Sequence, residues 1–172
     1  MRKILPFFIA LFTCSISFAQ TMKKYPAGQS GCTYYSYCEA PFKVSMSQDS
    51  SIIYNGECVS GEVSYGIICV KLLRSIGEMQ LAEDMLIAYM DYLKQSFGIT
   101  KAAGYGKGHH LNSNELTRGV LDYWQDQENN NWKVKGWTDG NYIAVLYAYS
   151  PKSLTESKIN LFLDGLRLPF TK

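Results

Sequence analysis

Polar and apolar residues alternate near residue 42, and this alternation is the first sign of regular structure in the chain. Residues 42–46 predict a strand with one buried face, because every second side chain of a strand lies on the same side. The runs 52–59 and 63–73 are rich in β-branched and aromatic residues and predict two further strands. Asn55-Gly56 and Ser60-Gly61 both suit a tight turn, so the register of this first hairpin stays open.

A helical period replaces the alternation after residue 75. Apolar residues then recur at spacings of three and four, which places them on one helix face: Ala82, Met85, Leu86, Tyr89, Leu93 and Phe97. Ser75 and Glu78 have the spacing of a capping box, and Gly98 suits the position just after the helix end. The sequence therefore predicts a long amphipathic helix of about five turns.

Strand patterns return in the second half of the chain. Residues 118–126, 132–138 and 142–150 are rich in β-branched and aromatic side chains, and turn residues separate them at 128–131 and at Asp139-Gly140. Connections this short join antiparallel neighbours, so the three runs predict an antiparallel meander.

A second, shorter helix is predicted near the C-terminus. Ser153 and Glu156 again have capping-box spacing, and the apolar residues that follow share one helical face: Ile159, Phe162, Leu163 and Leu166. Both helices have an apolar stripe to bury, and the sheet is the surface that can cover it. We therefore expect an α+β fold, an antiparallel β-sheet meander with a long central helix and a C-terminal helix.

The end of the chain resembles a known family. The strand over 142–149, the short helix after it and the tail over 162–168 are similar to the closing elements of the PsbP-like α/β/α sandwich family. The resemblance spans residues 40–170, and the chain differs from the family in its four early cysteines and its tyrosine-rich arm. It implies an α/β/α sandwich and a binding or assembly-assisting protein, and it carries over no catalytic residue.

The N-terminus has the pattern of a secretory signal peptide. Met1-Arg2-Lys3 is basic, residues 4–12 are apolar, and small residues at Ser17 and Ala19 suit cleavage after Ala19. A membrane anchor is the alternative, but the 16 residues of 4–19 are interrupted by polar side chains and fall short of the ~20 that a bilayer requires. The cleaved form is therefore expected to be secreted or periplasmic.

The sequence therefore predicts that the chain is divided into three parts. Residues 1–19 form the signal peptide, 20–41 an irregular arm rich in Tyr and Cys, and 42–172 a single α+β domain. A lipoprotein acylated at Cys14 is a lesser alternative, because Thr13 stands where a smaller residue is expected. No later apolar run approaches membrane length, so no transmembrane segment is expected in the mature chain.

Charge excludes one large class of partner. The full chain has 17 Lys and Arg against 15 Asp and Glu, and 47% of its residues are hydrophobic, which excludes a disordered chain. Cleavage removes two basic residues, Arg2 and Lys3, and no acidic one, so the mature chain carries no net charge. Nucleic acid is not an expected partner, because its binding requires a basic surface.

Four cysteines remain after cleavage, and all lie early in the mature chain: Cys32, Cys38, Cys58 and Cys69. In an exported protein an even set predicts two disulfides, with three possible connectivities. A zinc site would need closely spaced pairs, which these are not. No metal and no cofactor is expected.

Catalytic patterns are weak throughout the chain. His109 and His110 are adjacent, and neighbours on a strand point to opposite faces, so they rarely bind one metal together. A set of Ser113, His110 and Asp122 lacks the motifs that accompany a nucleophilic serine. The glycine-rich run 104–108 follows a helix and leads toward a strand, the reverse of a phosphate-binding loop.

Aromatic residues are unusually dense in the meander. Tyr123 and Trp124 are adjacent and must point to opposite faces, so either both faces of the sheet are covered or one face exposes aromatic rings. Asp126 shares a face with Trp124, and an exposed ring beside polar groups suits a sugar or a protein partner. Trp124, Trp137, Tyr123 and Asp126 are therefore the candidate ligand-binding residues.

Three hypotheses follow. The first is an exported non-enzymatic binding or accessory (assembly) domain that acts on a protein partner. The second is a glycan- or small-ligand-binding module that uses exposed aromatics, and the third is an enzyme with a site near His109 and His110. Oligomeric state stays open, and no catalytic residue is assigned.

Overall fold

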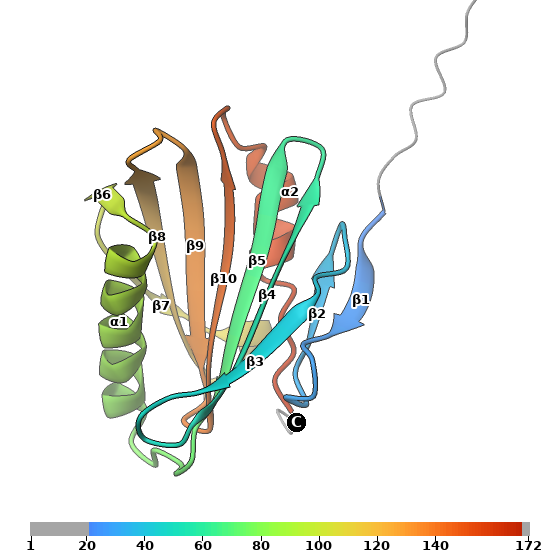
Figure 1. Cartoon of the computed structure of the whole chain (residues 1–172). Coiled ribbons are helices and arrows are strands. Elements are labelled where there is room, and N and C mark those ends of the chain that lie inside the picture. Colours follow the sequence, from blue (N-terminus) through green and yellow to red (C-terminus); the bar gives the residue numbers. More distant parts are fainter. Residues whose placement is uncertain (1–20, 170–172) are drawn as a thin grey trace, which may run out of the picture.

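An eight-stranded antiparallel sheet runs through the centre of the protein. The computed structural model describes residues 21–169. The strand order is β3-β4-β5-β10-β9-β8-β6, and β7 also pairs with β8 (Figure 1). The strands are β3 (Phe42–Met46), β4 (Ile52–Ser60), β5 (Val63–Lys71), β6 (Ile99–Ala102), β7 (Gly106–His109), β8 (Arg118–Asp126), β9 (Asn131–Thr138) and β10 (Tyr142–Ser150).

Two helices pack against opposite faces of this sheet. Helix α1 (Met79–Ser96) contacts β6, β8 and β9, and helix α2 (Glu156–Leu163) contacts β9 and β10. A separate hairpin of β1 (Lys23–Pro26) and β2 (Thr33–Ser36) lies on the α2 side, where β2 contacts α2. A 3₁₀ turn, η1 (Leu111–Ser113), precedes β8.

Each face of the sheet has its own hydrophobic core, because successive strand residues point to opposite sides. On the α1 face, Leu86, Met90 and Leu93 pack against the meander. On the α2 face, α2 and the β1–β2 hairpin cover the central strands. Aromatic residues therefore fill both sides of the sheet, as the odd spacing of the meander aromatics requires.

The meander strands are confirmed within one residue of their predicted bounds. The structure also assigns the register of the first hairpin. Ser60 pairs with Val63, so Gly61 with its φ of 65° lies in the turn, and Asn55-Gly56 lies inside β4. The predicted strand over 42–46 exists, but its expected buried face is wrong. Val44 and Met46 are exposed because β3 is an edge strand that extends past the core.

Both helices begin later than their capping boxes predict. The N-cap residues are Glu78 and Thr155, and neither makes a side-chain capping hydrogen bond. At the other end of α1, the Gly98 prediction is confirmed. Its φ is 64°, and its N–H donates to the carbonyl of Gln95 at 3.2 Å.

The fold-class prediction, an α+β domain of the PsbP-like α/β/α sandwich type, is contradicted. The described part of the chain is mostly antiparallel β-sheet, 44% strand against 19% helix, with one mid-chain and one C-terminal helix. It is not a helix-rich sandwich, because each face of the sheet carries one helix and a β-hairpin supplies part of the cover on one side.

The segment before residue 42 is also more regular than expected. Residues 20–41 were predicted as an irregular arm, and they contain β1 and β2 in a hairpin. An isolated bridge between Thr33 and Arg167 ties the hairpin to the C-terminal segment. The predicted signal peptide, its cleavage after Ala19 and the lipoprotein alternative at Cys14 lie outside the described residues.

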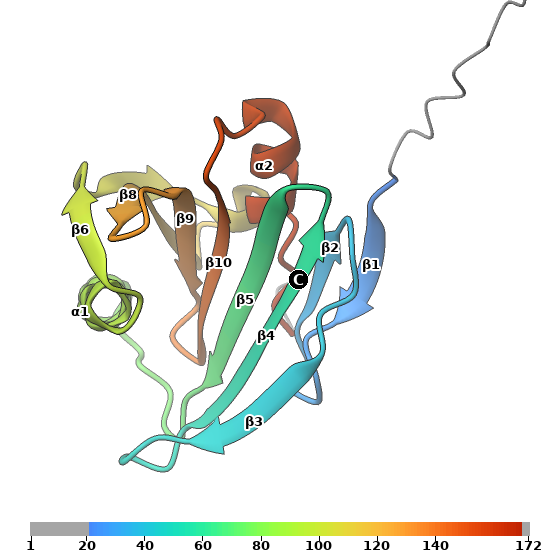
Figure 2. The same ribbon diagram turned by 45° about the horizontal axis from the view of Figure 1, so that its top comes forward.

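The sheet is strongly curved, and α1 lies in its concave face. Figure 2 shows α1 nearly end-on near β6, β8 and β9, while β5 and β4 lie further across the sheet and the β3–β4 turn comes back toward the α1 side. The helix therefore covers one half of the concave face, and the other half faces outward between α1 and β3. Within residues 21–169, no helix is both long and apolar enough to span a membrane.

Candidate functional site

A groove of about 300 Å³ lies on the concave face between α1 and the β3–β4 hairpin. We call it the apolar trough. Its floor is Ile53, Val70 and Ile143, and the helix wall is Met85, Ala88, Tyr89 and Tyr92. Leu72 and the turn residues Ser47, Asp49 and Ser51 complete it.

The floor of the apolar trough is built by strand register. Ile53 of β4 pairs with Val70 of β5, and Val70 pairs in turn with Ile143 of β10. The three β-branched side chains therefore stand in one row across adjacent strands, which is the spacing at which they pack against each other. Such a row forms a continuous apolar surface.

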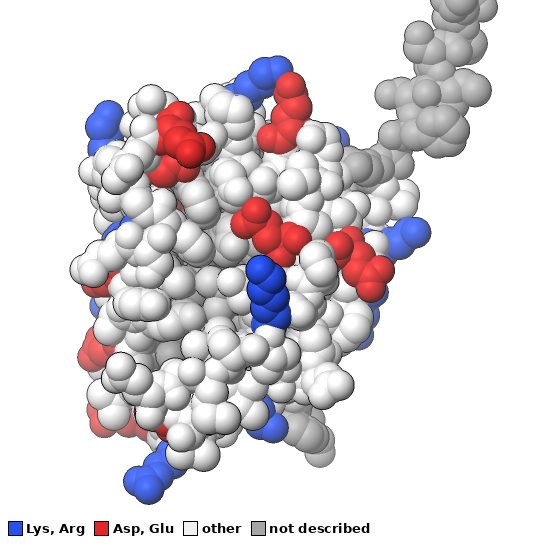
Figure 3. Space-filling view, in the orientation of Figure 1, with Lys and Arg blue, Asp and Glu red and all other residues white. Residues whose placement is uncertain are grey.

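The helix wall adds apolar side chains that remain exposed. Met85 is 39% exposed and Tyr92 is 61% exposed, although both belong to the helix that packs on the sheet. Met85 belongs to the predicted apolar stripe of α1 and Tyr92 does not, so Met85 shows that this stripe is wider than the part that the sheet covers. Figure 3 shows that charged side chains are sparse on this side of the molecule. A concave, mostly apolar surface with few polar groups is typical of a binding site.

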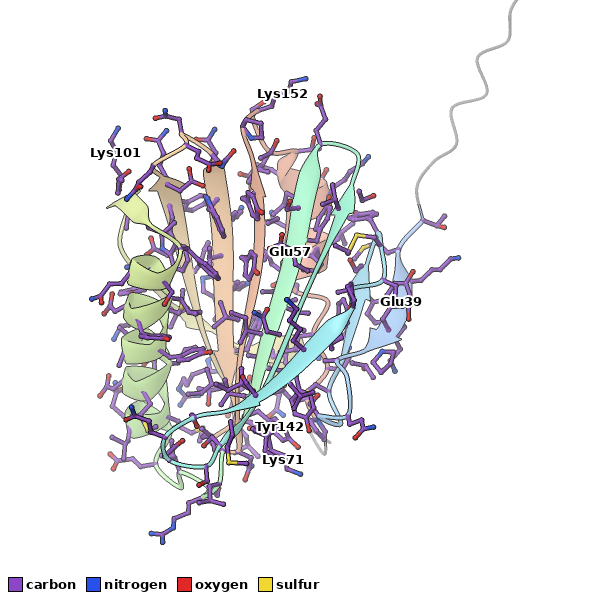
Figure 4. The ribbon with its side chains drawn as sticks, in the orientation of Figure 1. Glu39, Glu57, Lys71, Lys101, Tyr142 and Lys152 are labelled. Carbon is purple, nitrogen blue, oxygen red and sulfur yellow. A yellow bond between two sulfur atoms is a disulfide. The ribbon has the colours of Figure 1, made fainter. Side chains whose placement is uncertain are left out.

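A carboxylate lies further along the same face. Glu57 of β4, labelled in Figure 4, accepts hydrogen bonds from the hydroxyls of Tyr147 and Tyr149, both at 3.0 Å. Burial and the nearby Glu57 raise the pKa of Tyr147, so its hydroxyl keeps its proton and acts as a donor. Gly66 makes this arrangement possible, because a Cβ there would lie 2.0 Å from the Tyr147 ring.

The three tryptophans are core residues. Trp124 is 3% exposed, Trp132 is 6% exposed and Trp137 is 1% exposed. Trp132 stacks on Tyr149 with a centroid distance of 4.1 Å. The structure therefore offers no exposed indole as a stacking platform, and the predicted use of Trp124 or Trp137 for that purpose is not supported.

Asp126, another predicted ligand residue, is occupied by the β8–β9 turn. Its carboxylate accepts from the backbone N–H of Glu128 and of Asn130, from the Asn130 side chain and from Trp132 Nε1, at 2.8–2.9 Å. Burial opposes ionisation, but these hydrogen bonds outweigh it and lower the pKa of Asp126. The residue stabilises the turn, and no oxygen faces the apolar trough.

Tyr123 and Trp137 point to the α2 face, away from Trp124. Lys133 Nζ lies 4.9 Å above the Tyr123 ring, and Lys135 Nζ lies 4.5 Å above Trp137. Both lysines are buried and form ion pairs with α2, Lys133 with Glu156 and Lys135 with Asp164. The four predicted ligand residues are thus divided between two faces and do not form one site.

The histidine hypothesis has little geometric support. His110 Nδ1 lies 3.0 Å from the carbonyl oxygen of Thr117, within its own loop. Burial and the nearby Lys135 lower the pKa of His109. Asp122 is fully buried on the other face and pairs with Lys94 at 3.0 Å, so the set of Ser113, His110 and Asp122 is not assembled.

The predicted disulfides are shown in part. Cys38 and Cys58 are bonded, with a Cα–Cα distance of 6.0 Å, and they attach the end of the N-terminal arm to β4. Cys32 and Cys69 are buried thiols in the structure. A disulfide-bonded fold is compatible with an oxidising, extracytoplasmic location.

A second depression of about 550 Å³ lies where β5 ends and β10 begins. Two of its polar side chains, Asp139 and Tyr142, already serve local structure. The Tyr142 hydroxyl donates to the carbonyl of Ser30 at 3.1 Å, and Asp139 accepts from the N–H groups of Asn141 and Tyr142 at 2.9 Å. Lys71 is the cation that lines it (Figure 4). It is the weaker candidate for an apolar segment, because Lys71, Ser75 and Asn141 also line it.

Comparison with known proteins adds no relative. No protein-family model matches the chain, and no curated protein matches it. The resemblance to the PsbP-like family therefore remains without support from these comparisons.

Sequence reasoning missed the residues that form the candidate site. Met85 and Tyr89 were assigned to the buried face of the helix, and Ile53 and Glu57 were read only as strand residues. Glu57, which lies further along the same face, is the one charged residue of its strand and gives a local signal. The apolar trough itself has no local signal, because its residues come from four elements and one turn.

Proposed function

We propose that the protein is an exported, non-enzymatic binding domain that receives an apolar segment of a partner protein in the apolar trough. The observation that supports this best is the pair of exposed apolar side chains, Met85 and Tyr92, that face an apolar floor. Covering such a surface is favourable by roughly 25 cal/mol per Å² of apolar area. The segment that fits is mainly apolar, because the floor offers no charged partner and Asp49, which lines the apolar trough at the turn, already accepts hydrogen bonds from Ser51.

Hydrophobic dye binding tests the apolar trough directly. We expect 1-anilinonaphthalene-8-sulfonate to bind saturably to the native protein, and Met85→Glu to weaken this binding at least fivefold. Leu81→Glu is the matched control, because Leu81 is 50% exposed on the same helix and does not line the apolar trough. Equal affinities in the two variants would overturn the proposal.

Competition distinguishes a protein partner from a small ligand. Short uncharged peptides rich in Leu and Phe are expected to displace the dye, and peptides of equal length rich in Glu or Lys are not. Displacement by glycans but not by apolar peptides would favour the alternative, a glycan- or small-ligand-binding module. That alternative now depends on exposed tyrosines such as Tyr92 and Tyr123, because the tryptophans are buried.

Export is part of the same proposal. The Cys38–Cys58 disulfide supports it, since such bonds persist outside the cytoplasm. Intact mass of the protein recovered after secretion should correspond to a chain that begins at Gln20. A mass that includes residues 1–19 would contradict cleavage, and an acylated chain that begins at Cys14 would identify a lipoprotein.

A further inference from the structure

Two buried thiols, Cys32 and Cys69, lie in direct contact within the core. The sulfur atoms of Cys32 and Cys69 are 3.1 Å apart, closer than sulfur atoms that merely pack together. Cys32 immediately precedes β2, and Cys69 lies in the central strand β5. The contact thus joins segments that are 37 residues apart in the sequence.

Local structure holds Cys32 in this position. Ser30 Oγ accepts a hydrogen bond from the N–H of Cys32 at 3.0 Å and donates to the carbonyl of Ala27 at 2.7 Å. The carbonyl of Ser30 accepts from the Tyr142 hydroxyl, which fixes the loop to β10. These hydrogen bonds therefore hold the thiol of Cys32 against Cys69, where the hairpin contacts the sheet.

We propose that Cys32 and Cys69 form a second disulfide in the exported protein, nested around the first. The two thiols lose two protons and two electrons as the S–S bond forms. The acceptor is a disulfide, on a thiol oxidoreductase of the exporting compartment or on a small molecule such as oxidised glutathione, and it is reduced to two thiols. Together the two bridges would attach both ends of β2 to the main sheet.

The environment assigns different roles to the two thiols. The hydrogen bond from Cys69 lowers the pKa of Cys32 despite burial, and Ser30 adds to that effect. The same contact and burial raise the pKa of Cys69. The contact between the two sulfur atoms therefore favours a thiolate at Cys32 and a protonated thiol at Cys69.

Peptide mapping of the wild-type protein tests the bridge without any substitution. The secreted protein is alkylated with N-ethylmaleimide in denaturant and digested, unreduced, with trypsin and a glutamate-specific protease. Cleavage after Glu39 and Glu62 separates residues 25–39, which contain Cys32 and Cys38, from 63–71, which contain Cys69. Since Cys38 is bonded to Cys58, a link between these two peptides assigns Cys69 to Cys32. We expect 63–71 to remain linked to 25–39 until reduction. Release of 63–71 as an alkylated peptide would overturn the proposal.

Paired variants give an independent check of the connectivity. In the double variant C38S/C58S, any link between the tryptic peptides 25–43 and 44–71 must be Cys32–Cys69, and we expect that link. In C32S/C69S, reduction should add two hydrogens to the intact mass rather than the four expected for wild type. We also expect its melting temperature to fall by roughly 5–10 °C under oxidising conditions. A wild-type gain of two hydrogens would contradict the second bridge.

Discussion

Gly66 decides how the aromatic side chains of the concave face are arranged. It lies between Glu57 and Tyr147 in one row across β4, β5 and β10. Because it has no side chain, the Tyr147 ring lies over β5 and its hydroxyl reaches Glu57. A glycine inside a strand usually weakens it, but here the missing side chain of Gly66 is required for packing.

Gly66→Ala is therefore expected to destabilise the protein by roughly 3 kcal/mol, because the new Cβ overlaps the Tyr147 ring. Gly77→Ala is the control, since nothing lies within 4 Å of a Cβ there, and we expect a change within about 0.5 kcal/mol. Urea denaturation followed by tryptophan fluorescence measures both. Equal stability of the two variants would contradict the close contact.

Asp126 makes a prediction about pH. Its pKa in the folded state lies below the ordinary value, so its contribution is present at neutral pH and is lost as the pH falls through the folded pKa. Asp126→Asn should lower the free energy of unfolding at pH 7 by roughly 1–3 kcal/mol, because several hydrogen bonds lose their charged acceptor.

The difference between wild type and Asp126→Asn should shrink below about pH 4, where the carboxylate of the unfolded chain is protonated. Denaturation curves at pH 7, 5 and 3 test this trend. A difference that stays constant across the three pH values would show that the carboxylate's charge does not matter.

At the scale of elements, both helices are attached by apolar packing together with ion pairs to buried sheet residues. Helix α1 lies close to β9, where a Cβ at Gly136 would be 2.6 Å from Leu86 and 2.8 Å from the sulfur of Met90. Helix α2 also buries apolar residues, and two buried lysines of β9 pair with its acidic side chains. Helix α1 has a comparable ion pair, because its Lys94 lies 3.0 Å from the fully buried Asp122 of β8.

Leu86→Ala is expected to cost about 2–5 kcal/mol, because Leu86 is fully buried between α1 and the sheet. Leu161→Ala on α2 is the matched control, since that side chain is 61% exposed, and we expect less than about 1 kcal/mol. Chemical denaturation of both variants is the measurement. A small effect at Leu86 would indicate that the helix wall of the apolar trough is loosely held.

Elements with a long, regular pattern of hydrophobic residues could be predicted from the sequence. Elements that depend on contacts between residues far apart in the sequence could not. The strand over 142–150 and the core of α1 were confirmed. Strands β1 and β2 escaped prediction because their support is non-local, through the Thr33–Arg167 bridge and the Cys38–Cys58 bond. The helix starts were missed because a capping-box spacing also occurs in a preceding loop.

At the scale of the whole molecule, sheet curvature determines where a site can form. One helix covers β6, β8 and β9, and the curve carries β4 and β3 out of its reach. Composition could not predict this arrangement, since the same count of aromatic residues suits two packed cores or one exposed patch. Burial of Trp124, Trp132 and Trp137 decides in favour of packed cores.

The unpaired edge of β3 has a consequence for the behaviour of the protein at high concentration. Its N–H and C=O groups on the side away from β4 form a template to which another strand can add, and Val44 and Met46 stand exposed beside them. Two features of β3 oppose such growth. The strand is only five residues long, and the positively charged Lys43 side chains of two copies repel each other. Colloidal stability, rather than the free energy of unfolding, is therefore the property that depends on Lys43.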